Sequence, residues 1–567
     1  MLSDKNNKSV WRIIVLCSLI FILTTAVLFN FITSYKNNTT NYRSMNDLHF
    51  SSVFTPLQGK IVNIPLPERQ GKGGGMTSWG SYLVVITHEG KIYFVDQDYT
   101  VTQSGIEAPF NGFDDYVAAA AKPPFDKLDH NFANFRYNDI SYFKSNERQG
   151  FLVSYTKYDK VNACYTNAIS RLYVDDTSDD IINYEISSNL WTDIYQTSPC
   201  LPLKQEWRAI EGHMAGGRIA FDGEKTVYLS SGDYSWDGMY GPRTIPGTDP
   251  EKGPAVAQDP NADYGKVIAI DVITGDARQL SRGHRNMQGI IIDRNGRVWT
   301  VEHGARGGDE LNLIVEGKNY GWPLESYGTL YSTMPLKNMN SYGWHKEFQR
   351  PSTAWLPSIA VSGLTRIEGF HEAWNGDLLA STLVGQKLVR IRVANNHVIF
   401  SENIEVGQTV RHIHQHNDGK IVLWTDNKQL IFISPAAGGA GLKYVNFRLD
   451  TLQASDEIAN KVRSTIYSCM ECHSFNSEEN TKAPSLANIY HSKIGSTQFK
   501  GYSEALISDQ RVWTRELMEE YLTDPQSMLP GTIMSNPNIS DEIIRKEVID
   551  ILIGLATDIE IPPNYRD

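Results

Sequence analysis

Cysteine is scarce in this sequence, with five residues among 567. Cys17 lies in an apolar run near the amino terminus, and Cys469 and Cys472 belong to a motif described below. Only Cys164 and Cys200 remain, so the chain has room for a single disulfide, which would need an oxidising compartment. The bridge also requires their Cα atoms to lie within about 7 Å of each other.

Positive charge is not in excess either. The chain has 53 lysines and arginines against 65 aspartates and glutamates, a formal charge of −12. An acidic balance of this kind excludes nucleic acid, or a broadly anionic surface, as the general partner. A chain of 567 residues is too long for one hydrophobic core, so we expect at least two domains.

No second pair of cysteine or histidine ligands follows Cys469 and Cys472, which argues against a zinc site. No βαβ pattern surrounds them, which argues against a thioredoxin-like redox pair. His473 follows directly, and Cys-x-x-Cys-His is the attachment pattern of c-type haem. The thiols add to the haem vinyl groups and the imidazole reaches the iron. The motif therefore predicts one covalent haem c, with His473 as an iron ligand.

The sequence that follows this motif resembles a class I cytochrome c over residues 455–567. It has a proline loop at 483–486, an apolar face with a period of four, and a Pro-Gly-Thr turn before Met534. The apolar face consists of Trp513, Leu517 and Tyr521. The resemblance implies iron ligation by His473 and Met534, which raises the reduction potential and leaves no open position for oxygen. The alternative for Met534 is a core methionine, as for Met518 and Met528.

Small residues spaced for signal-peptide cleavage are absent after the apolar run at 13–33. About twenty uncharged residues suffice to span a bilayer. Lysines and an arginine within residues 1–12 favour a cytoplasmic amino terminus. We therefore expect an uncleaved transmembrane signal-anchor, a tether at 34–50, and a location in the bacterial inner membrane. The bulk of the chain would lie in the periplasm, where c-type haem is attached.

Helical periodicity is almost absent between residues 51 and 436. Short alternating runs occur instead, and a unit of strand, turn and strand recurs at 217–233, 288–303 and 411–426. Recurring hairpins in a long all-β stretch indicate propeller blades, and the length suits about six. The predicted fold is mainly β: a six-bladed propeller, a linker at 437–454 rich in glycine and alanine near its start, and a small all-α cytochrome c domain.

Three motifs lie close together in the second half of this stretch: 283–289 (GHRNMQG), 302–314 (EHGARGGDELNLI) and 319–323 (NYGWP). With them, most of residues 50–436 resembles the glucose/sorbosone dehydrogenase family, the six-bladed quinoprotein sugar dehydrogenases. The resemblance implies pyrroloquinoline quinone (PQQ) above the propeller axis, a calcium ion beside it, and hydride transfer from the C1 hydroxyl carbon of a sugar.

The resemblance also implies roles for single residues. Arg285 and Asn286 match the pair that hydrogen-bonds the quinone oxygens, and His213 is the candidate general base. The other matched positions are Gly304 and Ala305 (calcium through main-chain carbonyls), Glu310 and the Tyr320 carbonyl (a structural calcium), Trp355 (substrate side) and Arg411 (PQQ carboxylates). The alternative for Arg285, Asp309 and Glu310 is a buried polar network between blades.

The chain departs from the family pattern at three positions. His213 lies one residue further from Arg218 than the pattern has it, Val384 replaces a PQQ-binding lysine, and Thr409 replaces an arginine. Each lost cation removes roughly 1.5–3 kcal/mol of charge-assisted binding. Histidines at 412, 414 and 416 alternate along a predicted strand, as metal ligands or as packed side chains.

Two functions follow from these observations. The first is a membrane-anchored dehydrogenase that oxidises a sugar or other alcohol and passes electrons to its own haem, and then to a respiratory-chain or soluble redox partner. The alternative is a PQQ-free propeller that binds a carbohydrate or a protein and is attached to an electron-transfer cytochrome.

Overall fold

A computed structural model describes residues 47–50, 52, 57–64, 73–127, 130, 132–145, 148–174, 181–182, 184–203, 213–245, 248–249, 252–337, 339, 341, 343–435, 440–470, 472–475, 482–497 and 499–556. The predicted transmembrane run at 13–33 lies outside these ranges. Within them, no helix is both long and apolar enough to cross a bilayer.

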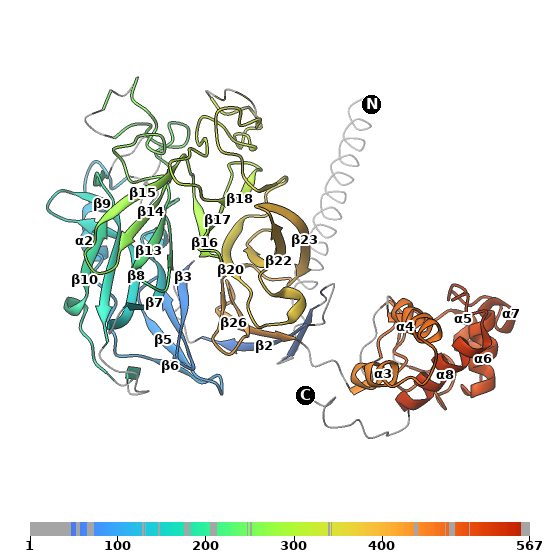
Figure 1. Cartoon of the computed structure of the whole chain (residues 1–567). Coiled ribbons are helices and arrows are strands. Elements are labelled where there is room, and N and C mark those ends of the chain that lie inside the picture. Colours follow the sequence, from blue (N-terminus) through green and yellow to red (C-terminus); the bar gives the residue numbers. More distant parts are fainter. Residues whose placement is uncertain are drawn as a thin grey trace, which may run out of the picture.

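Six antiparallel sheets form the blades of a propeller (Figure 1). Five have four strands in sequence order, and β11 (Leu201–Pro202) pairs with the third strand of the second. They are β3–β6 (Gly74–Trp79, Tyr82–Thr87, Ile92–Val95, Val101–Gln103), β7–β10 (Tyr137–Ser145, Arg148–Asp159, Cys164–Tyr173, Thr192–Gln196), β12–β15 (Gly216–Phe221, Thr226–Ser231, Lys266–Asp271, Ala277–Arg282), β16–β19 (Met287–Ile292, Val298–Glu302, Asp309–Leu313, Thr353–Trp355) and β20–β23 (Val361–Arg366, Leu378–Thr382, Lys387–Ala394, His397–Glu405).

The sixth blade joins the two ends of the propeller sequence. Its inner strands are β24 (Val410–Gln415), β25 (Ile421–Thr425) and β26 (Gln429–Pro435), and its outer strands are β2 (Leu57–Asn63) and β1 (Asp47–Phe50). Strand β2 pairs with β26 along its whole length. The innermost strands β3, β7, β12, β16, β20 and β24 contact one another in a closed ring. The predicted six-bladed propeller is therefore confirmed, and the three predicted hairpins are β12–β13, β16–β17 and β24–β25.

Each pair of neighbouring blades shares an apolar cluster, because alternate side chains of a strand point to opposite faces of its sheet. Between the fourth and fifth blades, for example, Trp299 and Val301 pack against Leu378 and Val389, all of them buried. Burial of such a side chain contributes about 1.5–3 kcal/mol. Cys164 and Cys200 form a disulfide with their Cα atoms 5.6 Å apart, next to the pairing of β11 with β9.

The carboxyl-terminal part is helical, and its helices share one core. They are α3 (Ala440–Asp450), α4 (Asp456–Met470), α5 (Glu504–Ser508), α6 (Arg515–Thr523), α7 (Pro525–Met528) and α8 (Glu542–Ala556). Here the structure differs from the linker expected at 437–454. Helix α3 lies inside that range because Tyr444, Val445 and Leu449 are buried in the core. The propeller also contains a helix that the sequence pattern did not predict, α2 (Phe113–Ala120).

The predicted apolar face of the 513–521 segment is only partly correct. Thr514 caps α6, and its hydroxyl accepts a hydrogen bond from the Leu517 amide, so Trp513 precedes the helix. The buried residues of α6 are Met518, Tyr521 and Leu522, whereas Leu517 is half-buried. The Trp513 ring still packs edge-on against Tyr521, with ring centroids 5.1 Å apart.

Candidate active site

The six innermost strands begin at one end of the propeller, which is called the mouth here. The buried side chain of Arg218 hydrogen-bonds to residues near the start of several of these strands. Its Nη1 donates to the carbonyls of Gly74 (2.7 Å) and Asn138 (2.9 Å), and its Nη2 donates to the carbonyl of Arg411 (3.3 Å). The long loops of the third and fourth blades extend beyond the strands, at the top of the view in Figure 1.

Arg285 lies at the mouth, just before β16. Its Nη1 donates to the Gly304 carbonyl (2.6 Å), and its backbone N–H donates to the Glu302 carboxylate (2.9 Å). The guanidinium carbon lies 5.2 Å from the centroid of the Trp322 ring. The buried Nε has no acceptor among the described residues. A buried cationic donor without an acceptor is uncommon, and it suits a ligand that presents an oxygen atom.

Asn286 lies beside Arg285. Its Oδ1 accepts hydrogen bonds from the Gly216 amide (3.2 Å) and from Nε2 of Gln288 (2.7 Å). With the carboxamide oxygen engaged in this way, the NH₂ group is the part of the side chain that can donate to a ligand.

His213 reaches the same loop in spite of its shifted place in the sequence. Its Nδ1 lies 2.8 Å from Oγ of Ser235. The Ser235 amide donates to Oδ1 of Asp233 (2.8 Å), and the Asp233 amide donates to the Arg285 carbonyl (2.9 Å). The loop 233–235 thus contacts both the His213 ring and the main chain of Arg285.

Asp233 and Trp322 belong to this cluster, although the sequence alone did not single them out as site residues. Oδ2 of Asp233 accepts from Nε1 of Trp322 at 2.7 Å. Burial, and then the nearby Asp237, raise the pKa of Asp233 to about 8. Their positions in the sequence could have pointed to them, because Asp233 ends a predicted hairpin and Trp322 lies in the Asn-Tyr-Gly-Trp-Pro motif.

The predicted calcium positions form a buried polar network. The Gly304 amide donates to Oδ1 of Asp309 (3.0 Å), whose other oxygen accepts from the amides of Ile359 (3.0 Å) and Ala360 (2.6 Å). Asp309 therefore joins the fourth blade to the fifth. Ala305, which the resemblance paired with Gly304, is buried.

Glu310 and Tyr320, the predicted structural calcium residues, are both buried. Burial, and then the charge of Glu302, raise the pKa of Glu310. Across the described ranges, no three His, Cys, Asp or Glu side chains are grouped so that they could hold a metal ion. The calcium sites were expected to use main-chain carbonyls, which are not among these side-chain ligands.

The side of the mouth expected to bind PQQ carboxylates has fewer of the expected cations. Arg411 forms a two-point ion pair with Asp426, with Nη2 and Oδ2 2.8 Å apart. Val384 is 79% exposed on the turn between β21 and β22. Trp355, on β19, pairs with Asp309 and is half-buried against the cluster of the fourth and fifth blades.

A cavity of about 130 Å³ lies on the propeller axis, lined by residues of all six innermost strands, including Asp139, His412 and His414. Oγ of Ser78 lies 2.8 Å from Nε2 of His414 and 2.9 Å from Nδ1 of His416. Burial lowers the pKa of His414 to about 3, so its imidazole is neutral at neutral pH. Nε2 of His412 lies 3.4 Å from Oδ1 of Asp139. These contacts favour the packed alternative for the three histidines.

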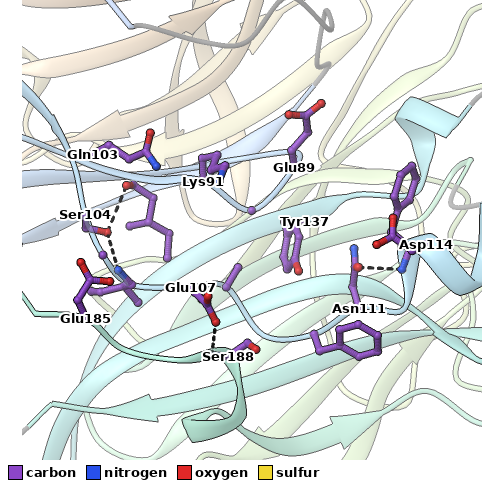
Figure 2. A pocket seen from close by; sticks show the side chains of 17 residues that line it. Glu89, Lys91, Gln103, Ser104, Glu107, Asn111, Asp114, Tyr137, Glu185 and Ser188 are labelled. Atoms are coloured by element: carbon purple, nitrogen blue, oxygen red, sulfur yellow. Dashed lines mark hydrogen bonds between the residues drawn. The ribbon is translucent and has the colours of Figure 1, made fainter.

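A larger cavity of about 750 Å³ lies between the first blade and the segment leading to α2 (Figure 2). Its wall carries the carboxylates of Glu89, Glu107 and Glu185, and the Glu107 carboxylate accepts from the Ser188 amide at 2.9 Å. None of the predicted site residues lines this cavity. It is therefore separate from the cluster around Arg285.

The haem motif lies at the end of α4. Nδ1 of His473 donates to the Pro484 carbonyl (2.7 Å), which fixes the ring and directs Nε2 to the place of an iron ligand. Cys469 is half-buried, Cys472 is exposed, and Met534 packs at the edge of the helical core. Thr532, beside Met534, is held by the Tyr521 hydroxyl at 2.6 Å. The residues present fit a covalent haem.

Both the propeller and the helical part have known relatives. The family model for glucose/sorbosone dehydrogenase matches residues 145–433. An uncharacterized protein of Synechocystis sp. is 43% identical over 179 residues, which is 30% of this chain and 43% of that protein. The aldose sugar dehydrogenase YliI of Escherichia coli is 28% identical over 232 residues, 40% of this chain and 61% of that protein. The matches thus span about half the length of these curated relatives.

The helical part has relatives of its own. Cytochrome c2 iso-2 of Magnetospirillum molischianum is 31% identical over 84 residues, which is 15% of this chain and 87% of that cytochrome. The chain therefore belongs to the glucose/sorbosone dehydrogenase family, and it carries a cytochrome c domain after its propeller.

Proposed function

We propose that this chain is a sugar dehydrogenase whose propeller oxidises an aldose or a related alcohol and whose own c-type haem takes the electrons. The observation that carries the proposal is that one loop, 233–235, contacts both the His213 ring and the main chain of Arg285, next to Asn286 at the mouth. A base and two hydrogen-bond donors at one place are what oxidation of an alcohol by a quinone requires.

In this proposal each residue has a defined task. His213 takes the hydroxyl proton of the sugar through Nε2, because Ser235 holds Nδ1 and orients the ring. Arg285 and Asn286 hold the oxygens of PQQ, with the orphaned Nε of Arg285 as one donor. PQQ, when bound, supplies the acceptor for the hydride of the sugar carbon.

Calcium belongs to the same proposal. The carbonyls of Gly304 and Ala305 would hold one ion at the mouth, and Glu310 with the Tyr320 carbonyl would hold another. The second site fits an ion, because the buried Glu302 and Glu310 carboxylates lie close enough to raise the pKa of Glu310. A divalent cation would offset this repulsion. At the first site the Gly304 carbonyl accepts a hydrogen bond from Nη1 of Arg285, which an ion there would have to displace.

The cytochrome would pass electrons from His473/Met534-ligated haem to a soluble or respiratory-chain partner. We further propose that residues 13–33 anchor the chain in the bacterial inner membrane, with the propeller and cytochrome in the periplasm. The support for this location is the uncharged run itself and the haem motif.

A second function is favoured by one specific observation. Arg411, the remaining cation expected to hold PQQ carboxylates, is paired with Asp426. A propeller without PQQ would then bind a carbohydrate or protein while its cytochrome serves another donor.

A dye-coupled assay separates the two functions. The full chain, matured with haem and supplied with calcium, is titrated with PQQ and given a panel of aldoses and an artificial electron acceptor. Dye reduction that needs both PQQ and an aldose supports the dehydrogenase. If a calorimetric titration detects no PQQ binding and the dye is not reduced, the binding module is the better account.

A further inference from the structure

The long loops of the third and fourth blades meet at the mouth, and a tyrosine of one loop contacts a tyrosine of the other. Tyr240 lies between β13 and β14, and Tyr331 lies between β18 and β19. The Tyr331 amide donates to the Tyr240 hydroxyl (3.4 Å), and the two rings pack edge-on with their centroids 5.8 Å apart. Oδ1 of Asp237 fixes this arrangement by accepting from the Tyr240 amide (2.8 Å). Tyr331 is 64% exposed, so its ring is open to a ligand.

Both tyrosines are attached to the part of the mouth that contains Arg285. Burial raises the pKa of the Tyr240 hydroxyl, and the nearby charge of Arg285 opposes this shift. The other tyrosine follows Thr329 by two residues, and Thr329 exchanges two backbone hydrogen bonds with Arg306 (2.9 and 3.0 Å). Arg306 in turn follows Gly304, whose carbonyl accepts from Nη1 of Arg285 at 2.6 Å. The aromatic pair therefore lies beside the guanidinium proposed to hold the quinone.

A small apolar cluster holds the pair in place. Met239 and Leu330, the chain neighbours of the two tyrosines, pack against the same four buried residues, which are Ala257, Ala305, Trp322 and Leu336. The ring of Trp322 also lies against the guanidinium of Arg285, at 5.2 Å. One cluster thus fixes the aromatic pair and the proposed quinone ligand relative to each other, so a ligand that contacts both would not have to order the loops first.

The exposed surface continues from the tyrosines along the turn between β17 and β18. Arg306 is exposed on this turn. Leu356, which is 61% exposed, has its Cδ2 only 3.7 Å from the point that a Cβ on Gly307 would occupy. The preceding residue, Trp355, accepts a hydrogen bond from the Gly308 amide through its carbonyl (3.0 Å). Apolar side chains and one guanidinium therefore lie along a single stretch of backbone.

This combination suits a sugar ring. The C–H face of a pyranose packs on an aromatic ring, and its hydroxyl oxygens accept hydrogen bonds from a guanidinium.

We propose that Tyr331 and Tyr240 form a subsite for the second sugar unit of an oligosaccharide, whose reducing-end unit is oxidised. Leu356 and Arg306 extend this subsite along the β17–β18 turn. The inference rests on the proposed function, because Arg285 and the general base would act on the first unit. The subsite contributes binding and no chemical step. A monosaccharide fills only the place of the first unit, so the favoured substrates are saccharides of two or more units with a free reducing end.

Calorimetric titration tests the subsite without PQQ. The full chain, matured with haem, is titrated with glucose and xylose and with maltotriose, cellotriose and xylotriose. We expect at least one trisaccharide to bind about three- to tenfold more tightly than its monosaccharide. Tyr331→Ala should abolish this preference, and Tyr331→Phe, which keeps the ring, should retain it. The control is Tyr184→Ala, at an exposed tyrosine between β9 and β10. The proposal is overturned if the unmodified chain prefers no trisaccharide, or if the preference survives in Tyr331→Ala.

Steady-state dye reduction with PQQ provides the kinetic test. Tyr331→Ala should raise the KM for the preferred trisaccharide about three- to tenfold, while its kcat and both constants for the monosaccharide stay the same. If the unmodified chain oxidises no sugar, the proposed function fails, and the titration alone decides whether the subsite exists. An unchanged KM for the trisaccharide would overturn the proposal, because Tyr331 would then contact no sugar. An equal rise in KM for both sugars would also overturn it, because Tyr331 would then contact the oxidised unit itself.

Discussion

Oγ of Ser235 lies 2.8 Å from Nδ1 of His213. This contact matters because His213 is displaced by one residue from the place expected of the general base. Ser235 belongs to the loop that also binds the Arg285 carbonyl, so the displaced histidine and Arg285 contact the same loop.

Replacing either partner of this contact should affect the oxidation of sugar to different degrees. His213→Ala removes the proposed base, and we expect kcat/KM with an aldose to fall by about 10²- to 10⁴-fold. Ser235→Ala removes only the hydrogen bond that orients the ring, and a loss of about tenfold is expected. Steady-state dye reduction measures both. Ser496→Ala, on the exposed surface of the cytochrome domain, is the control, and full activity of His213→Ala would refute the assignment.

Val384→Lys should restore a missing cation at the mouth. Because Val384 is exposed, a lysine can be placed there without disturbing the core. One charge-assisted contact contributes about 1.5–3 kcal/mol, so we expect PQQ to bind roughly tenfold to a hundredfold more tightly. Calorimetric titration measures this change, with Val384→Gln as the uncharged control. Equal affinities for the two variants would show that this turn does not face the PQQ carboxylates.

Met534→Ala should alter the haem and leave the fold largely intact. Loss of a thioether ligand lowers the reduction potential and opens the iron to external ligands. Met518→Ala is the matched control, because Met518 is buried in the helical core; its loss should cost about 2–5 kcal/mol of stability without moving the potential. Spectroelectrochemistry and thermal unfolding distinguish the two. A Met534→Ala protein with an unchanged potential would make Met534 a core methionine.

Lys266 should make the stability of the propeller depend on pH. Its Nζ is buried and donates to the carbonyls of Val256, Ala257 and Tyr264. Burial lowers the pKa of Lys266 from its ordinary 10.5 to about 7. Between these values the unfolded chain binds a proton that the native chain does not, so stability rises with pH across this window, by at most about 1.4 kcal/mol per unit.

Denaturant unfolding at several pH values checks this sign. Lys266→Met should lose the slope between about pH 7 and 10, whereas Lys225→Met, at an exposed position, should keep it. A variant at position 266 with the same slope as the unmodified chain would mean that another group is responsible.

Breaking the disulfide should destabilise the second blade. Cys164 and Cys200 are 36 positions apart in the sequence, and a bridge closing a loop of this size contributes about 3–4 kcal/mol in the chain-entropy estimate. The double replacement by serine should lower the unfolding midpoint of the propeller and leave that of the cytochrome domain unchanged. A parallel fall in both midpoints would indicate that the two parts unfold together.

Local patterns predicted much of this structure. The hairpin 411–426 became β24–β25 because alternating side chains and an Asn-Asp-Gly turn define a strand register. The same hairpin brings Arg411 next to Asp426. Arg411 lies at a register shift of β24 and Asp426 one residue beyond β25, so the strand pattern alone did not predict this contact. The haem motif could be predicted without knowledge of tertiary contacts, because the Cys-x-x-Cys-His spacing alone provides the groups that attach haem.

Other features depend on contacts between distant segments. The composition near residue 440 suggested a linker, yet α3 forms because its apolar side chains meet α4 and α8. The contact of His213 with Ser235 joins positions on either side of a hairpin, and no periodicity marks it. The orphaned Nε of Arg285 likewise becomes visible only when its surroundings are known.

The absorbance of the haem α-band tests the central claim most directly. The full chain, matured with haem and supplied with calcium and PQQ, is mixed with an aldose, and the band is followed in time. Our account predicts that the haem becomes reduced only when both PQQ and the sugar are present. A haem that ascorbate reduces but that stays oxidised with PQQ and every aldose would contradict it.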